Sequence, residues 1–97
     1  MIEVQQTETF ARWFSALRDA VARKGIARRI ALLGGGHFGD VKSVGDKVFE
    51  LRIDHGPGYR VYFARRGEAV ILLLAGGDKS SQDRDIAKAK QLAAERD

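Results

Sequence analysis

The stretch ELRIDHGPGYRVYF, at positions 50–63, limits the possible folds of this chain more than any other segment. Two runs in which apolar and polar residues alternate flank a Gly-Pro-Gly turn, a pattern that is typical of an antiparallel hairpin. Alternation places Leu51 and Ile53 on the same face as Val61 and Phe63. The chain therefore contains a sheet with an apolar face that other elements must cover.

The register of this hairpin decides where its two arginines lie. Because the apolar faces of both strands must point to the same side, the allowed registers differ by two residues. In one of them Arg52 lies opposite Arg60, and the two guanidinium groups form a cradle for an anion. In the other, Arg52 lies opposite Tyr62, and Asp54 neutralises Arg60 in an ordinary cross-strand pair. The sequence leaves both registers open.

Patterns on both sides of the hairpin predict the remaining elements. Apolar residues at helical spacing predict two consecutive helices in the N-terminal part, and the glycines at 34–36 end the second one. The run at 70–75 is apolar on both faces, as expected for the most buried strand. The expected elements are a strand at Ile2–Val4, a helix capped by Thr7, a helix at about Asp19–Leu33, strands at Val41–Val44, Val48–Ile53, Tyr59–Arg65 and Val70–Ala75, and a helix capped by Ser80 or Ser81.

This order of elements predicts an α+β fold in a single domain over residues 1–97. We expect an antiparallel sheet of about four to five strands, with two N-terminal helices and one C-terminal helix. The residues of the second helix that are expected to face the core are Val21, Ile26, Ile30 and Leu33.

Charge and composition limit the classes of function. The chain has 17 Lys and Arg against 13 Asp and Glu, a net charge of +4, and the hairpin region is strongly basic. Such a local excess favours an anionic partner: nucleic acid, an acidic protein or a phosphorylated ligand. The absence of cysteine excludes disulfides and a thiol nucleophile. The apolar run at 69–75 is too short to span a membrane and the N-terminus lacks a signal-peptide pattern, so we expect a cytoplasmic protein.

Two glycine-containing motifs have a structural interpretation. GGGHFG at 34–39 matches G-x-G-x-x-G, but it follows a predicted helix, whereas the nucleotide-binding fingerprint follows a strand. GGDKSS at 76–81 lacks the spacing of a phosphate-binding loop, so helix capping is the better interpretation. Lys79 in this segment still adds a cation near the end of the central strand. His37 and His55 lack partners at ligand spacing, so no metal site and no cofactor are expected.

Several motifs in fixed order carry a resemblance to a known family. The residues ELR, GYRVYF and ILLLAGGDKSSQDRDIAKAK, preceded by a helical F-x-x-W-F segment, resemble the HigB-like branch of the RelE/ParE superfamily of bacterial toxins. The resemblance covers nearly the whole chain and implies a small α+β fold with helices packed on an antiparallel sheet. Its ribonuclease members cut messenger RNA, usually on the ribosome. They are neutralised by a cognate antitoxin, often of the helix-turn-helix type.

The resemblance implies a reaction in which a 2′-hydroxyl of the RNA attacks the neighbouring phosphate without a metal. The protein would then stabilise negative charge on the phosphorane and on the leaving oxygen. Arg60 is the first candidate for the phosphate, Arg52 the second and Lys79 the third. His55, beside an aspartate and near two arginines, is the candidate general acid or base.

Further residues are predicted to bind RNA. Tyr59 and Tyr62 flank an arginine, and aromatic residues between cations suit stacking on unpaired bases. Alternation turns Tyr59 toward the core and leaves Tyr62 on the face of the arginines, so Tyr62 is the predicted contact. Lys47 and Arg65 are the additional predicted RNA-binding cations.

The C-terminal segment LAAERD opens an alternative. It has neither the histidine nor the tyrosine on which several nuclease members rely. ParE-type relatives share the fold but bind DNA gyrase without cutting RNA. The fold alone therefore does not determine the reaction. The alternative hypothesis is therefore a non-enzymatic toxin that inhibits DNA gyrase, and a degenerate toxin kept only as the partner of its antitoxin is a weaker third one.

Overall fold

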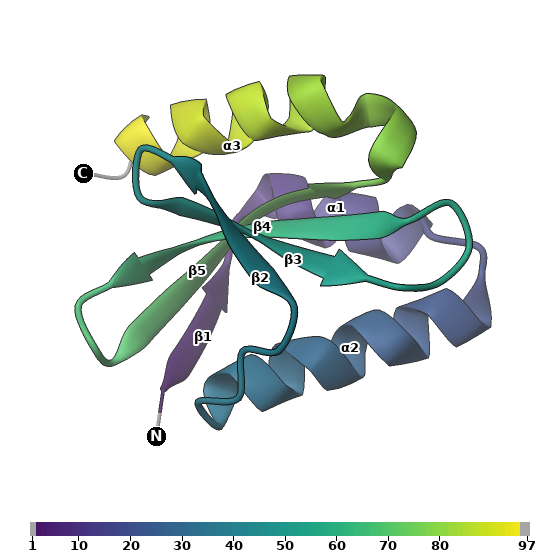
Figure 1. Cartoon of the computed structure of the whole chain (residues 1–97), viewed down its shortest axis with the longest axis horizontal. Helices are drawn as coiled ribbons and strands as arrows, with labels where there is room; N and C mark the ends of the chain where they lie inside the picture. Colours follow the sequence, from purple (N-terminus) through teal and green to yellow (C-terminus); the bar gives the residue numbers. More distant parts are fainter. Residues whose placement is uncertain (1, 96–97) are drawn as a thin grey trace.

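The computed structural model describes residues 2–95, which form one sheet with helices on both of its faces (Figure 1). Its elements, in chain order, are β1 (Glu3–Gln6), α1 (Glu8–Ala16), α2 (Ala20–Gly34), β2 (Val41–Gly45), β3 (Val48–Ile53), β4 (Tyr59–Arg66), β5 (Val70–Gly77), the 3₁₀ turn η1 (Lys79–Ser81) and α3 (Gln82–Glu95). The predicted α+β class and the predicted set of helices and strands are confirmed.

The sheet has five strands in the order β1-β5-β4-β3-β2. Strands β2 to β5 pair antiparallel, whereas β1 pairs parallel to β5. The expectation of an entirely antiparallel sheet thus holds for four strands and is wrong for β1. The four consecutive strands from β2 to β5 are connected, each to the next, by short turns. Strands connected in this way can pair only antiparallel. No turn links β1 to β5, because two helices and three strands lie between them.

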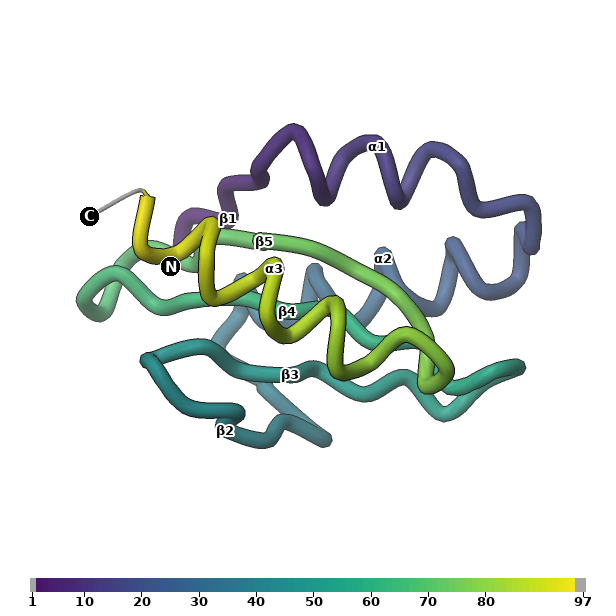
Figure 2. Tube along the Cα trace, turned by 90° about the horizontal axis from the view of Figure 1, so that it is seen from above, coloured from purple at the N-terminus to yellow at the C-terminus, as the bar shows by residue number. Residues whose placement is uncertain are grey.

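Each face of the sheet carries its own apolar core. Figure 1 shows α3 above the sheet and α2 below it, and Figure 2 shows α3 crossing β4 and β5. On the side of α1 and α2 the buried residues are Phe10, Ile26, Leu33, Leu51, Ile53, Val61, Phe63, Ile71 and Leu73. On the side of α3 they are Val48, Tyr62, Ala64, Leu72, Leu74, Ala75, Ala89, Leu92 and Ala93. Burial on both faces explains why the sequence of β5 is apolar throughout.

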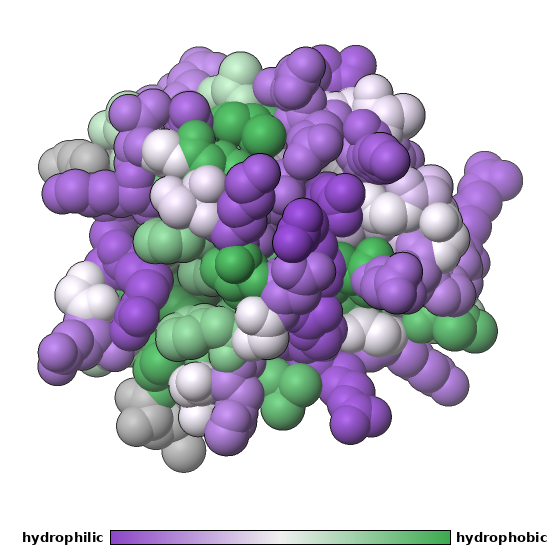
Figure 3. Space-filling model, viewed as in Figure 1, coloured by the Kyte–Doolittle hydropathy of each residue, from purple (hydrophilic) through white to green (hydrophobic). Residues whose placement is uncertain are grey.

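The face of the molecule seen in Figure 3 is mainly hydrophilic. In the view of Figure 3, hydrophilic side chains cover most of the molecule, and apolar ones show in patches between them. Among the described residues, no helix has the length and apolar character that crossing a membrane requires.

The first two helices begin at residues that the sequence marks, and the second one also ends at such residues. Phe10 N donates to Thr7 Oγ1 at 3.1 Å, so the predicted cap of α1 is confirmed. Asp19 caps α2 in the same way, and Gly36, with φ of +86°, follows its end. The prediction for Val21 is wrong, because this side chain is 66% exposed. Ala22 instead shares the buried stripe of α2, one residue further along.

The last helix begins where the sequence predicts it, since α3 starts at Gln82, directly after Ser81. The turn η1 before it has a cap of its own, Asp78: Ser80 N donates to Asp78 Oδ1 at 2.8 Å. Ser81 completes a capping box, since its Oγ accepts from Asp78 N at 3.4 Å. The predicted start of the helix after Ser80 or Ser81 thus agrees with α3, whereas the 3₁₀ turn before it was not predicted.

Candidate anion-binding cleft

A shallow cleft of about 380 Å³ lies at the end of the sheet where the hairpin loop joins β3 to β4. Its lining residues are Asp40, Arg52, Ile53, Asp54, Gly58 and Arg60. Arg52 and Arg60 are directly opposed across the two strands, so the chain adopts the first of the two registers. The structure thus brings the two predicted arginines together beside an open hollow.

Arg52 is bound to a carboxylate of the preceding loop. Asp40 Oδ1 accepts from Arg52 Nε at 3.1 Å and from Arg52 Nη2 at 2.7 Å. The side-chain hydrogen bond from Arg52 lowers the pKa of Asp40, and the same bond raises the pKa of Arg52. Asp40 therefore offsets the repulsion between the two opposed arginines, and an anion that uses Arg52 has to compete with it.

Arg60 is held from the interior of the protein. Its side chain is 14% exposed, and its Nε lies 4.0 Å from Glu50 Oε2. A Cβ atom at Gly58 would lie 4.0 Å from both terminal nitrogens of Arg60, so these nitrogens lie beside a residue that lines the cleft. The Nε of this guanidinium is therefore buried, while its terminal nitrogens lie at the cleft and can donate hydrogen bonds there.

Lys79 lies next to the same loop. Its backbone N donates to Pro57 O at 3.3 Å, and its Cβ would lie 3.4 Å from a Cβ at Gly58. Gly58 has a φ of +78°, a conformation that favours glycine. The three cations that sequence analysis ranked for the phosphate, Arg60, Arg52 and Lys79, are therefore all found around the hairpin loop.

His55 is not brought into the cleft. Its Nε2 lies 3.2 Å from Asp19 Oδ2, at the start of α2, and its ring stacks on Tyr59 with centroids 6.5 Å apart. The pKa of Asp19 is lowered first by the backbone hydrogen bond from Ala22 and then by the hydrogen bond with His55. This histidine joins the hairpin loop to a helix terminus, and a role as general acid or base requires it to leave that contact.

Tyr62 is fully buried, so the predicted contact with a base is wrong for this conformation. Alternation correctly placed it on the face of Arg60, but α3 covers that part of the face. Its hydroxyl donates to Glu50 Oε2 at 3.2 Å, and burial raises its pKa above the ordinary value. Glu50 and Gln82 also belong to the site, and neither was predicted from the sequence. The available signal was the first register, which places Glu50 directly opposite Tyr62.

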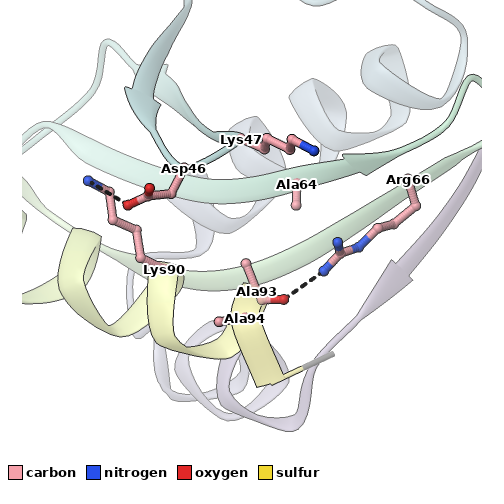
Figure 4. A pocket seen from close by; sticks show the side chains of 7 residues that line it. All are labelled: Asp46, Lys47, Ala64, Arg66, Lys90, Ala93 and Ala94. Carbon is pink, nitrogen blue, oxygen red and sulfur yellow. Dashed lines mark hydrogen bonds and ion pairs between the residues drawn. The ribbon is translucent and has the colours of Figure 1, made fainter. Parts of the chain in front are cut away.

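The two additional cations predicted to bind RNA lie away from this cleft. Lys47, in the turn between β2 and β3, lines a second cleft of about 340 Å³ beside the end of α3 (Figure 4). In that cleft Lys90 pairs with Asp46 at 3.5 Å. The guanidinium of Arg65 lies 5.0 Å above the ring of Phe38, outside the cleft that Arg52 and Arg60 line. Their role in binding RNA stays a prediction.

Within residues 2–95, no group of three or more histidine, cysteine, aspartate or glutamate residues is arranged to hold a metal ion.

Comparison with known proteins places the chain in a family. The model of the family described as phage derived protein Gp49-like (DUF891) matches residues 12–96. The chain belongs to the Gp49-like family. An uncharacterized protein of Haemophilus influenzae is 51% identical to this Gp49-like chain over 94 residues, which cover 97% of the chain and 95% of that protein.

A solved structure supports the fold of the Gp49-like chain. It is that of E. coli toxin RelE, a double arginine-to-alanine mutant in the free state, with a TM-score of 0.70 at 15% sequence identity. The match covers 98% of this chain and 96% of the RelE chain. The chain therefore has the RelE fold, and the fold that the resemblance to RelE/ParE toxins implied is confirmed.

Proposed function

We propose that this Gp49-like chain is the toxin of a type II toxin–antitoxin module, of the HigB-like branch, and that it cleaves messenger RNA on the ribosome. The RelE fold and the family membership support the toxin class. The observation that carries the nuclease activity is the pair of opposed arginines, Arg52 and Arg60, beside an open cleft with Lys79 at the same loop. Cations grouped in this way suit a phosphate whose charge increases during the reaction.

In the proposed reaction, the 2′-hydroxyl oxygen of a nucleotide forms a bond to the adjacent phosphorus, and the bond from phosphorus to the 5′-oxygen breaks. The hydroxyl proton passes to a base and the 5′-oxygen gains a proton. Arg60 binds a non-bridging oxygen through its terminal nitrogens, since these border the cleft. Arg52 binds a second oxygen once the anion replaces Asp40, and Lys79 stabilises the leaving oxygen. Each contact strengthens as negative charge develops.

The proposed partners are messenger RNA, the ribosome and a cognate antitoxin, expected to be of the helix-turn-helix type. The basic residues around the cleft favour the phosphate backbone of the RNA. The same cations suit an acidic segment of the antitoxin, so that substrate and inhibitor compete for them.

One observation favours the second candidate, a toxin that binds DNA gyrase without cutting RNA. The residues that line the cleft include neither a histidine nor a tyrosine, and His55 pairs with Asp19 instead. Binding without chemistry needs no proton transfer, so a cleft of this composition also suits a purely inhibitory contact.

Induced expression with mapping of RNA 5′ ends tests the proposal and separates the two candidates. We expect the wild-type chain to arrest growth and to produce new ends within translated messages. Arg60→Ala should abolish both effects, whereas Arg28→Ala, an exposed arginine on α2, should leave them unchanged. Circular dichroism must show that both variants are folded. Growth arrest with intact messages and a DNA-damage response would favour the gyrase-inhibiting toxin.

A further inference from the structure

A carboxylate lies buried directly behind the proposed phosphate-binding arginine. Glu50, in the middle of β3, is 1% exposed. Burying a carboxylate is costly unless hydrogen bonds and a counter-charge compensate for the lost water. Replacing a whole buried ion pair by hydrophobic residues of similar size is often neutral or stabilising. Stability alone therefore gives little reason for burying the pair of Glu50 and Arg60.

Three polar groups converge on one oxygen of this carboxylate. Gln82 Nε2 donates to Glu50 Oε2 at 2.7 Å, and Tyr62 donates from its hydroxyl at 3.2 Å. Arg60 Nε approaches the same oxygen to 4.0 Å. The two donors come from α3 and β4, so Glu50 is held from two directions and its orientation is restricted.

The buried end of the Arg60 guanidinium has Glu50 as its counter-charge. Its Nε is buried and has no hydrogen-bond partner, so the carboxylate 4.0 Å away is the nearest compensation for the charge at that end of the guanidinium. The terminal nitrogens lie toward Gly58 at the cleft. The carboxylate of Glu50 attracts the guanidinium at its Nε, and both terminal nitrogens remain available at the cleft. The guanidinium can therefore donate two parallel hydrogen bonds to an anion there.

We propose that Glu50, held by Tyr62 and Gln82, is a positioning residue that orients Arg60 toward the phosphate of the substrate. The proposal rests on the function proposed above, and it assigns a role to three residues that do not touch the substrate. Glu50 acts through Arg60 alone, since its burial excludes contact with RNA.

The consequence is a separation of binding from catalysis. Glu50→Gln removes the buried negative charge and keeps the size of the side chain. Arg60 then attracts an anion at least as strongly as before, because the buried carboxylate no longer competes for its charge. Its donors are less well oriented for the transition state, and small displacements of a catalytic group can cost up to about 100-fold in rate.

The test compares wild type, Glu50→Gln and the matched control Glu68→Gln, whose carboxylate is exposed in the turn between β4 and β5. Cleavage is measured on ribosomes programmed with a defined messenger RNA. Affinity is measured with an RNA carrying 2′-O-methyl groups, which lacks the nucleophile. For Glu50→Gln we expect cleavage to fall by about 10- to 100-fold while affinity stays within about twofold of wild type or increases. Glu68→Gln should behave as wild type.

An NMR measurement tests the orientation of Arg60 without relying on RNA cleavage. The Nε–Hε signal of Arg60 in a ¹H–¹⁵N spectrum, assigned by its loss in Arg60→Lys, should be resolved and slow to exchange because the atom is buried. It should shift or broaden in Glu50→Gln and stay in place in Glu68→Gln. If the wild type cuts no RNA, the proposed function fails, and this signal, followed during titration with inorganic phosphate, still shows whether Glu50 orients Arg60.

An unchanged signal and unchanged cleavage in folded Glu50→Gln would overturn the proposal. The proposal would also be overturned if affinity and cleavage fell together, each in proportion to the fraction of unfolded protein. A purely structural residue behaves in that way. If Glu50→Gln does not fold, Gln82→Ala replaces it, because Gln82 is only partly buried and supplies one of the two donors. We expect the same separation of rate from affinity in that variant, with a smaller loss of rate.

Discussion

Asp40 and Arg52 form a pair in which one carboxylate oxygen accepts two hydrogen bonds from the guanidinium, at 2.7 and 3.1 Å. The backbone repeats the contact, since Arg52 N donates to Asp40 O at 3.0 Å. The loop before β2 thereby supplies the negative charge that lets two arginines face each other across β3 and β4. The same carboxylate occupies donors that a phosphate needs.

Replacement of this carboxylate should increase the affinity for RNA. In Asp40→Asn the guanidinium of Arg52 loses its charged partner and becomes available to a phosphate. We expect about two- to fivefold tighter binding of a single-stranded RNA, the range of an exposed ion pair. Fluorescence anisotropy at constant salt measures the change. Asp46→Asn, which affects the pair with Lys90 in the other cleft, is the matched control, and an equal gain there would show a general charge effect instead.

Acid should destabilise the fold through three carboxylates with lowered pKa values. Hydrogen bonds from the backbone of α2, from Arg52 and from Ser80 are the leading causes for Asp19, Asp40 and Asp78 respectively. Because folding lowers these pKa values below 3.8, the stabilisation is present above about pH 4 and is lost as the pH falls through the folded-state values. We expect a constant melting temperature from pH 7 to pH 5 and a fall below about pH 4.

The same reasoning predicts the effect of the cap alone. Asp19→Ala removes the acceptor for the first turn of α2 and the partner of His55, so the melting temperature at pH 7 should fall by about 4–8 °C. As the pH falls through the lowered pKa of Asp19, the difference should shrink. A difference that stays constant from pH 7 to pH 2 would show that the charge of Asp19 does not contribute.

Tyr62 should matter for stability and not for contact with a base. Tyr62→Phe keeps the ring and removes the hydroxyl that donates to Glu50, so a buried acceptor loses one of its donors. We expect the free energy of unfolding to fall by about 1–2 kcal/mol, measured by urea denaturation. Tyr59→Phe, at a half-buried position, is the control and should change stability by less. Full stability of Tyr62→Phe would contradict the hydrogen bond.

The hairpin shows how far sequence reasoning reaches. Alternation placed Leu51 and Val61 in the core and reduced the registers to two, because side chains change face at every residue. It did not choose between them, since both registers bury the same apolar residues. The observed register brings Arg52 opposite Arg60. The repulsion between these two charges is offset by Asp40. Asp40 lies in a loop, and a periodic pattern in the sequence does not predict where a loop residue lies.

The site was predicted in part for a related reason. Alternation reports which face of the sheet a residue shares, and on this basis Tyr62 was correctly placed with Arg60. It does not report what covers that face. The helix α3 crosses it and buries Tyr62 and Glu50 while leaving the terminal nitrogens of Arg60 at the cleft. His55 was grouped with the arginines by proximity in sequence, but the loop turns it toward Asp19.

Two glycines should respond oppositely to alanine. A Cβ atom at Gly76 would overlap the ring of Trp13, which packs against β5 in the core, whereas a Cβ at Gly25 on α2 would meet nothing within 4 Å. Gly76→Ala should therefore lower the free energy of unfolding by about 1–3 kcal/mol, as overpacking does. Gly25→Ala should raise it by about 0.5–1 kcal/mol, because alanine loses less conformational entropy than glycine in a helix. Thermal and urea denaturation of both variants measure the two changes, and a stable Gly76→Ala protein would show that Trp13 can move aside.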